Sequence, residues 1–274
     1  MSSYDKDSLI SKYEGLLQYF RTWGKVAVAF SGGVDSTFLV YAAHEALGEN
    51  AIAITASLYS TPEAELLEAK EYCQKIGVSQ YIARIDELQI EGFAKNPTNR
   101  CYICKKAIFG KLISIAEEHD ISQVVEGSNL DDNGDYRPGM LAIKELGVKS
   151  PLQEVGFTKQ DIRNLSQLKN IPTWNKPSAA CLSSRIPYGE LITVQKLQMI
   201  DKAENLLKQY GFANVRVRVH GNVARIEIDS SEFSRLMAVD IRDVVYSKLQ
   251  EVGFAYVTLD LKGFRSGSMN EVIK

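Results

Sequence analysis

Residues 26–36 read V-A-V-A-F-S-G-G-V-D-S, and this stretch constrains the fold more than any other part of the chain. An apolar run ends at S-G-G-V-D-S (31–36) and a helical pattern follows, which predicts a strand, a loop of small residues and the start of a helix. Gly32 and Gly33 let the backbone approach a ligand closely. The N–H groups at the start of a helix favour an anion.

The composition of this loop points to a phosphate ligand. Ser31 and Ser36 add hydroxyl donors, while Asp35 would repel a bare phosphate unless a divalent cation such as Mg²⁺ lay between them. The loop is not a Walker loop, since no Gly-Lys-Ser/Thr ends it, and it is not the dinucleotide pattern G-x-G-x-x-G. A glycine turn without a ligand is the alternative. We expect Ser31, Gly32, Gly33 and Ser36 to bind phosphate directly and Asp35 to bind it through the cation.

Composition and charge limit the classes of protein that this chain can represent. Its 274 residues suffice for one large domain or two smaller ones, and 45% hydrophobic with 24% charged residues is typical of a soluble globular protein. The net charge of -2 and the pI of about 6.0 argue against a nucleic-acid partner. The sequence shows no signal pattern and no apolar run that could span a bilayer, so we expect a cytoplasmic protein without a membrane partner.

Strands alternate with helices over the first part of the chain. Such alternation predicts an α/β fold, a doubly wound, mostly parallel, Rossmann-like sheet covered on both faces. The predicted helices are 5–21, 37–47, 61–76, 102–119 and 158–169, and the predicted strands are 25–30, 51–56, 80–85 and 123–126.

The pattern changes in the last third of the chain. A helix over 193–210, strands over 215–219 and 223–228, a helix over 231–252 and a strand over 256–261 predict a smaller C-terminal α+β domain. We place the boundary near residue 187, which gives domains of residues 1–186 and 187–274.

Two loops are candidates for function. Residues 127–139, which begin with Gly127, follow the carboxyl end of a predicted strand, where open α/β sheets bind ligands. A solvated acidic loop is an equally open alternative. Residues 172–189 form a long loop rich in Pro, Ser and Asn, and loops of that length inside compact domains are often functional.

Three of the four cysteines form a possible shared site. Cys101 and Cys104 make a C-x-x-C at a helix start, and Cys181 lies in the second long loop. Three thiolates without a fourth ligand disfavour a closed zinc site, but they fit an iron–sulfur cube with one iron open to substrate or sulfide. A redox dithiol and unrelated cysteines are the alternatives. We interpret Cys73, which lies in a helical pattern, as a buried thiol.

Arginines mark a possible anion site in the second half of the chain. Arg216 and Arg218 alternate along one predicted strand, should share a face, and could clamp a phosphate or carboxylate. A solvated sheet face is the alternative. Arg185, beside Ser184 in the cysteine loop, is another candidate anion contact. Arg265 lies in a glycine-flanked basic tail that either closes over an anionic ligand or is an ordinary tail.

Several motifs together resemble one family. The stretches V-A-F-S-G-G-V-D-S, D-Y-R-P-G, W-N-K, S-S-R-I-P-Y-G, V-R-V-R, A-R-I-E and Y-V-T-L-D-L-x-G-F-R-S-G-S-M-N look like the LarE family of the PP-loop ATP pyrophosphatase superfamily, over residues 26–270. Members of that family are ATP-dependent sulfur transferases that make the nickel-pincer nucleotide cofactor in lactate racemase maturation.

The resemblance implies a substrate, cofactors and roles for particular residues. The substrate would be a pyridinium mononucleotide with two carboxylates, each adenylated and then converted to a thiocarboxylate. The loop and Gly127 would bind ATP, with Mg²⁺ on Asp35. Residues 187–274 would serve substrate binding and oligomerisation, because the family's oligomers imply that this chain forms a homo-oligomer. The residues implied to bind substrate are Ser184, Arg185, Glu204, Arg216, Arg218 and Arg265.

One departure from the sacrificial branch of the family concerns the source of sulfur. In that branch a cysteine gives up its own sulfur and becomes dehydroalanine, and this position aligns with Ala180. That branch also lacks the pair that is Cys101 and Cys104 here. The pattern resembles the cluster-bearing branch, which implies a [4Fe-4S] cluster on Cys101, Cys104 and Cys181.

Three alternatives stay open at this point. Cys181 could be a sacrificial sulfur donor. The chain could be a PP-loop enzyme that thiolates tRNA or forms an amide. It could also be a non-catalytic protein that binds a nucleotide or a metal.

Overall fold

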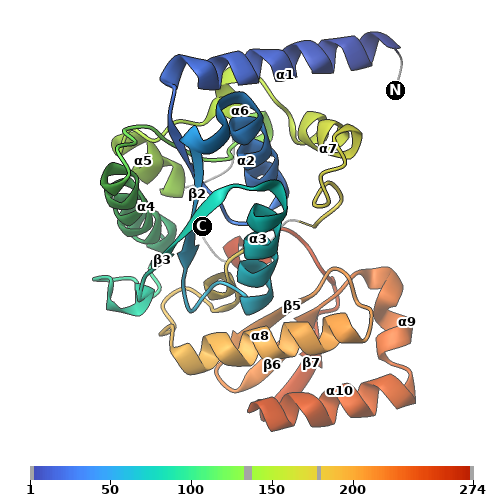
Figure 1. The fold of residues 1–274 in the computed structure, drawn as a ribbon. Helices are drawn as coiled ribbons and strands as arrows, with labels where there is room; N and C mark the ends of the chain where they lie inside the picture. Colours follow the sequence, from blue (N-terminus) through green and yellow to red (C-terminus); the bar gives the residue numbers. More distant parts are fainter. Residues whose placement is uncertain (1–2, 133–137, 178–179, 272–274) are drawn as a thin grey trace. The chain divides into compact units, whose positions relative to one another are not determined.

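The computed structural model of the chain describes residues 3–132, 138–177 and 180–271 (Figure 1). The chain forms two compact units, Met1–Asp86 with Asn99–Ala179, and Glu87–Thr98 with Ala180–Lys274. The predicted domain boundary near residue 187 separates parts that would fold independently. The compactness of the two units does not test independent folding, so this boundary stays a prediction. Within the described ranges, no helix combines the length and the apolar character that crossing a bilayer requires.

The first unit is built on a parallel sheet with the strand order β3-β2-β1-β4. Its strands are β1 (Val26–Ala29), β2 (Ala51–Ser57), β3 (Ser79–Arg84) and β4 (Val124–Val125). β1 pairs in parallel with both β2 and β4, so the chain runs to one side of β1 first and crosses to the other side later. Ligands of open α/β sheets bind at such a switch point, beyond the carboxyl ends of the strands.

Helices cover both faces of this sheet, as the alternating pattern predicts. α2 (Val34–Leu47), α3 (Glu63–Ile76), α1 (Ser3–Trp23) and α7 (Lys159–Leu168) contribute to one apolar cluster, which includes Val26 and Val28. α4 (Arg100–Glu118) and α5 (Pro138–Glu145) contribute to the other cluster, which includes Ala27, and Figure 1 shows these two helices together beside the sheet. Because both faces are buried, β1 is apolar throughout rather than alternating.

The sequence did not predict two short helices of the first unit. These are α5 and α6 (Pro151–Val155). Both helices begin at a proline. In a polar stretch a proline usually indicates a turn, but proline is also favoured in the first turn of a helix, so the sequence pattern did not distinguish the two. The prediction for Cys73 is confirmed, since its side chain is 0% exposed and burial raises the pKa of its thiol to about 12.

The second unit is a small α+β layer, as predicted. β5 (Arg216–His220) and β6 (Val223–Glu227) are antiparallel, and β7 (Tyr256–Leu259) pairs in parallel with β6. α8 (Val194–Gln209) and α10 (Val239–Val252) pack on this sheet. The 3₁₀ turns of the two units are η1 (Gly48–Asn50), η2 (Glu87–Gln89), η3 (Leu130–Asp132), η4 (Leu182–Arg185), η5 (Ser230–Glu232) and η6 (Ser268–Asn270).

One predicted helix of the second unit is wrong in detail. The helix expected over 231–252 is interrupted, because α9 (Phe233–Leu236) ends and α10 begins after Ala238, whose backbone is extended at φ -59 and ψ 134. Neither Met237 nor Ala238 disfavours a helix, so intrinsic propensity carries no sign of this break.

Candidate active site

The loop after β1 takes the shape that its sequence predicts. The Oγ atoms of Ser31 and Ser36 lie 3.0 Å apart, and the Ser36 hydroxyl donates to the carbonyl of Gly33 at 3.3 Å. Gly33 is the N-cap of α2, and no described side chain caps this helix start. The first-turn N–H groups of α2 therefore carry no side-chain cap among the described residues and can donate to an anion, as at other helix N-termini.

Two positions around the loop require glycine. Gly32 has φ +72, a left-handed conformation, and a Cβ there would lie 3.3 Å from the Cβ of Ala69. A Cβ at Gly127 would lie 3.1 Å from the backbone nitrogen of Ser36. Glycine at 127 thus brings the segment after β4 directly against the loop after β1, which are the two loops at the switch point.

Asp35 is held by two residues that the sequence did not single out. Its Oδ2 accepts a hydrogen bond from Nζ of Lys159 at 2.5 Å, and its Oδ1 accepts one from Nδ2 of Asn129 at 3.3 Å. Asn129 belongs to a loop that the sequence marked as a candidate, so its position after a strand was a usable signal. Lys159 is the first residue of α7, and no sequence pattern around it indicates a site residue.

A buried carboxylate orders the segment after β4. Glu126 is 7% exposed and accepts hydrogen bonds from Oγ of Ser128 at 2.8 Å and from Oγ of Ser150 at 2.5 Å. Asn129 is fixed next to it, because its N–H donates to the carboxylate of Asp132 at 2.9 Å. Residues 133–137 of the predicted 127–139 loop lie outside the described residues.

A second lysine also reaches the loop. Nζ of Lys176 donates to the carbonyl of Gly32 at 3.2 Å and to Glu68 at 2.6 Å. Lys176 therefore supports the backbone of Gly32 in its left-handed conformation. It was part of the W-N-K stretch but was not named as a site residue.

The cysteines divide between the two units. Cys101 and Cys104 lie near the N-terminus of α4, three residues apart and thus on one face of the helix. Cys101 is exposed and Cys104 is partly exposed. Cys181 is exposed and belongs to the second unit, directly before η4. Among the described residues, no three or more His, Cys, Asp or Glu side chains are grouped so that they could hold a metal ion.

Arg185 and Glu204 form a buried pair in the second unit. Nε and Nη2 of Arg185 each donate to the Glu204 carboxylate at 2.8 Å, and both side chains are 3% exposed. Nη1 of Arg185 donates to the backbone carbonyls of Ala180 at 2.6 Å and Cys181 at 3.1 Å. Arg185 therefore fixes the backbone that carries Cys181, and Glu204 orients Arg185.

Arg216 and Arg218 lie on one face of the small sheet, as their alternation predicts, with Glu227 opposite Arg216. Arg218 donates to Glu227 at 2.8 Å and to the carbonyl of Ser184 at 3.2 Å, while its buried Nε has no hydrogen-bond partner among the described residues. Burial, followed by the nearby charge of Arg185, lowers the pKa of Arg216 to about 10. Crowded, partly desolvated guanidinium groups of this kind would be stabilised by an anion.

Arg265 is tied into the C-terminal segment. Its Nη1 donates to Asp260 at 3.2 Å and to the carbonyl of Gly263 at 3.1 Å, and its Nε donates to Glu271 at 2.5 Å. The hydrogen bond to Glu271 raises the pKa of the Arg265 guanidinium. Its expected role as an anion contact stays a prediction.

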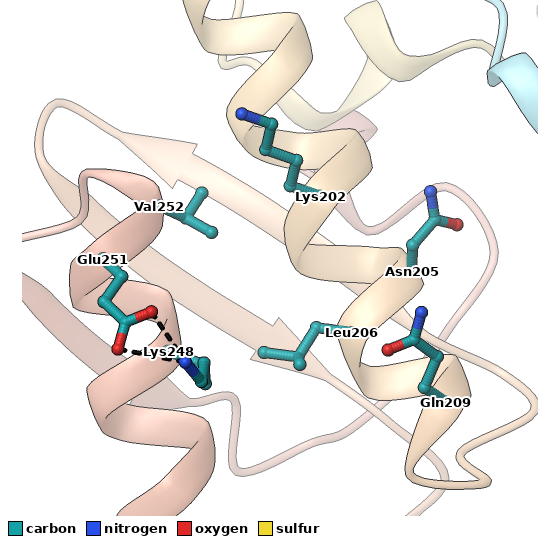
Figure 2. A pocket seen from close by; sticks show the side chains of 7 residues that line it. All are labelled: Lys202, Asn205, Leu206, Gln209, Lys248, Glu251 and Val252. Atoms are coloured by element: carbon teal, nitrogen blue, oxygen red, sulfur yellow. Dashed lines mark hydrogen bonds and ion pairs between the residues drawn. The ribbon is translucent and has the colours of Figure 1, made fainter.

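None of these candidates lines the pocket between α8 and α10. Figure 2 shows its lining side chains, with an ion pair between Lys248 and Glu251 at 2.8 Å. Its volume is about 440 Å³. The sequence singled out none of its lining residues, which are Lys202, Asn205, Leu206, Gln209, Lys248, Glu251 and Val252.

Similar proteins cover almost the whole chain. The chain is 42% identical over 266 residues to an uncharacterised protein of Synechocystis sp., covering 97% of this chain and 99% of that protein. It is 36% identical over 267 residues to the pyridinium-3,5-bisthiocarboxylic acid mononucleotide synthase of Lactiplantibacillus plantarum, covering 97% of this chain and 96% of that enzyme. The chain belongs to the LarE family. Residues 12–108 also match the NAD synthase family model, which places the loop after β1 in the PP-loop class.

Membership in the LarE family confirms the expected enzyme class. The chain is an ATP-dependent sulfurtransferase of the PP-loop type. The stretch that matches the NAD synthase family model contains the loop after β1, at the switch point of the parallel sheet.

Proposed function

We propose that this LarE-family protein converts the two carboxylates of a pyridinium mononucleotide to thiocarboxylates at the expense of ATP. The observation that carries the proposal is the 36% identity, over 97% of the chain, to an enzyme named for a pyridinium bisthiocarboxylic acid mononucleotide. The polar loop at the β1–β4 switch point supports it independently, because it suits a nucleotide phosphate.

The first step is adenylation of a substrate carboxylate. A carboxylate oxygen attacks the α-phosphorus of ATP, the bond between that phosphorus and the oxygen bridging the α- and β-phosphates breaks, and pyrophosphate leaves. The N–H groups at the start of α2 would stabilise the charge on the departing pyrophosphate. Ser31, Gly32, Gly33, Ser36 and Gly127 would form this ATP site.

Asp35 is the proposed residue for Mg²⁺. Its carboxylate is partly exposed, with a side-chain exposure of 25%, and it lies in the first turn of α2 beside the proposed phosphate site. Carboxylate oxygens are ligands that Mg²⁺ prefers, so the residue fits the ion. Bound there, Mg²⁺ would neutralise charge on the phosphates.

The second step exchanges oxygen for sulfur. A sulfur nucleophile attacks the carbonyl carbon of the acyl adenylate, and AMP leaves with the former carboxylate oxygen. Arg216 and Arg218 would hold the substrate phosphate, which the lowered pKa of Arg216 supports. We assign Ser184, Arg185 and Glu204 to positioning the Cys181 segment beside the substrate. Arg265 would close over an anionic group.

We propose that Cys101, Cys104 and Cys181 hold a [4Fe-4S] cluster that supplies the transferable sulfide. Exposed Cys181 and the pair on one face of α4 give three thiols whose number suits a cluster with one open iron. Sacrificial donation by Cys181 is the alternative source. The protein would work as a cytoplasmic homo-oligomer. Sedimentation of the purified protein would test the oligomeric state.

The experiment that tests the function measures pyrophosphate and product together. The protein is incubated with Mg-ATP, the biscarboxylate mononucleotide and sulfide under anaerobic conditions. We expect pyrophosphate release that depends on the mononucleotide and a product mass raised by replacement of oxygen with sulfur. Release that depends on tRNA instead would favour the tRNA-thiolating alternative.

A second experiment separates the two sulfur sources. Wild-type protein and the variants Cys181→Ala and Cys73→Ala are reconstituted anaerobically with iron and sulfide. Roughly four irons per chain in the wild type and in Cys73→Ala, lost in Cys181→Ala, would support the cluster. Absence of iron, with loss of one sulfur's mass from Cys181 after turnover, would support the sacrificial route.

A further inference from the structure

Three arginines share one face of the small sheet in the second unit, which we call the arginine face. Arg216 and Arg218 alternate along β5, and Arg218 pairs directly with Arg225 of β6. Directly paired residues of neighbouring strands point to the same side of a sheet. Three positive charges so close together repel one another, so the orientation of each guanidinium depends on the groups around it.

The C-terminal segment contacts two of these arginines in different ways. Nη2 of Arg218 donates to Oγ of Ser268 at 3.0 Å and to the Glu227 carboxylate at 2.8 Å. The ring of Phe264 lies over Arg216 instead, with its centroid 5.2 Å from Cζ of the guanidinium. A carboxylate neutralises a cation, whereas a neutral ring orients it without removing its charge.

The backbone holds Phe264 in this place. Its N–H donates to the carbonyl of Ile228, directly after β6, at 2.8 Å. The preceding Gly263 has φ +69, and a Cβ there would lie only 2.6 Å from the same carbonyl oxygen. Glycine therefore permits a close approach that a side chain would prevent, and this approach fixes the start of the segment that carries the ring.

Stacking on a ring suits an arginine that must also bind an anion. The ring contacts the flat side of the guanidinium, whereas the N–H donors lie in its plane and keep their directions. One of these donors, Nη1 of Arg216, reaches the carbonyl of Val215 at 2.7 Å. Burial lowers the pKa of Arg216 to about 10, and the negative face of the ring favours the protonated form.

We propose that Phe264 is a positioning residue for the substrate, because its ring holds the guanidinium plane of Arg216 in the orientation that binds the phosphate of the mononucleotide. Phe264 acts through Arg216 and touches no substrate atom in this role. The inference rests on the proposed function, in which Arg216 contacts the substrate phosphate. Without the ring, Arg216 keeps its charge but loses its fixed orientation, so the substrate binds more weakly while the chemical step keeps its rate.

The test measures pyrophosphate release at saturating Mg-ATP while the concentration of the biscarboxylate mononucleotide is varied. Phe264→Leu keeps an apolar side chain but removes the ring, and it should raise KM for the mononucleotide roughly fivefold to thirtyfold. Its kcat and its KM for ATP should match the wild type, because a contact kept throughout the reaction affects binding alone. Phe264→Tyr keeps the ring and should keep the wild-type KM.

Two controls separate the stacking from general stability. In the same unit, the ring of Phe212 lies against Arg235, with its centroid 4.5 Å from Cζ of that guanidinium. Phe212→Leu removes this matched contact and should leave KM for the mononucleotide unchanged. The nucleoside form of the substrate lacks the phosphate, and it should bind to wild-type protein and to Phe264→Leu equally in isothermal titration calorimetry.

The outcomes distinguish the inference from the proposed function. A wild-type KM in Phe264→Leu overturns the inference alone, and so does an equal rise of KM in Phe264→Tyr or in Phe212→Leu. A matching loss of nucleoside affinity in Phe264→Leu also contradicts it, because the effect would not depend on the phosphate. If the wild-type protein releases no pyrophosphate with the mononucleotide, the proposed function fails and the inference fails with it.

Discussion

The loop site of the first unit and the buried pair of Arg185 and Glu204 in the second unit handle charge in opposite ways. At the loop, the ion pair of Lys159 and Asp35 is about one-quarter exposed, with side-chain exposures of 26% and 25%. In the second unit, Arg185 and Glu204 are each 3% exposed and joined by two hydrogen bonds. Water can replace either partner at the loop but not in the buried pair.

This difference indicates two kinds of role. A pair that solvent reaches can exchange partners, which suits a site that must bind and release a nucleotide with its cation. A buried bidentate pair has one stable geometry, because separating the charges leaves each without solvent. Such a pair suits a segment that must hold Cys181 in place. The backbone carbonyl of Cys181 accepts a hydrogen bond from Arg185.

The largest effect should follow from breaking the buried pair. Glu204→Ala leaves the Arg185 guanidinium buried without its counter-ion, and we expect the free energy of unfolding to fall by about 3–5 kcal/mol. Urea denaturation of the purified protein measures this. The control Glu251→Ala removes the exposed partner of Lys248 and should leave the unfolding midpoint unchanged. Equal behaviour of the two variants would remove the distinction between buried and exposed pairs.

A smaller effect should follow from changing the loop backbone. Gly32→Ala places a Cβ on a residue with φ +72 and only 3.3 Å from Ala69, so we expect a loss of about 1–2 kcal/mol together with weaker ATP binding. Gly33→Ala is the matched control, because Gly33 has φ -79, which any residue adopts. Thermal unfolding and ATP titration measure the two effects. Equal losses in both variants would show that the conformation of Gly32 is not the cause.

Removing a helix cap should sharpen the comparison between the units. Thr158 caps α7 in the first unit and Thr193 caps α8 in the second, each by accepting a hydrogen bond from a backbone N–H. Substitution of either by alanine should cost about 1 kcal/mol of stability. Only Thr158→Ala should also weaken ATP binding, because it loosens the start of α7, whose Lys159 holds Asp35 beside the loop. Weaker binding in Thr193→Ala as well would point to a general loss of stability.

The smallest effect concerns the buried thiol. Burial raises the pKa of Cys73 from 9.0 to about 12, so the unfolded chain loses this proton first as the pH rises. The stability from the protonated thiol is present below pH 9 and is lost toward pH 12, with a fall of about 0.8 kcal/mol between pH 8 and 9.5. Cys73→Ala should lack this slope in urea denaturation. An identical pH dependence of the two proteins would contradict the assignment.

Local patterns were enough to predict the main features of both units. The S-G-G-V-D-S loop, the parallel sheet and the shared face of Arg216 and Arg218 follow from spacing within short stretches. The period of a strand or helix decides which neighbouring side chains share a face, and this information is contained in the sequence. The break after α9 was missed, because residues 237–238 carry no breaking signal.

Only the tertiary structure decided which charged groups face one another. Lys159 and Asp35 are 124 positions apart, and nothing around either residue names the other. The same holds for the pairing of Arg185 with Glu204 and for the assignment of residues 87–98 to the second unit. Such pairs are selected when the packing of separate elements brings side chains together, and periodicity within one element contains no record of that choice.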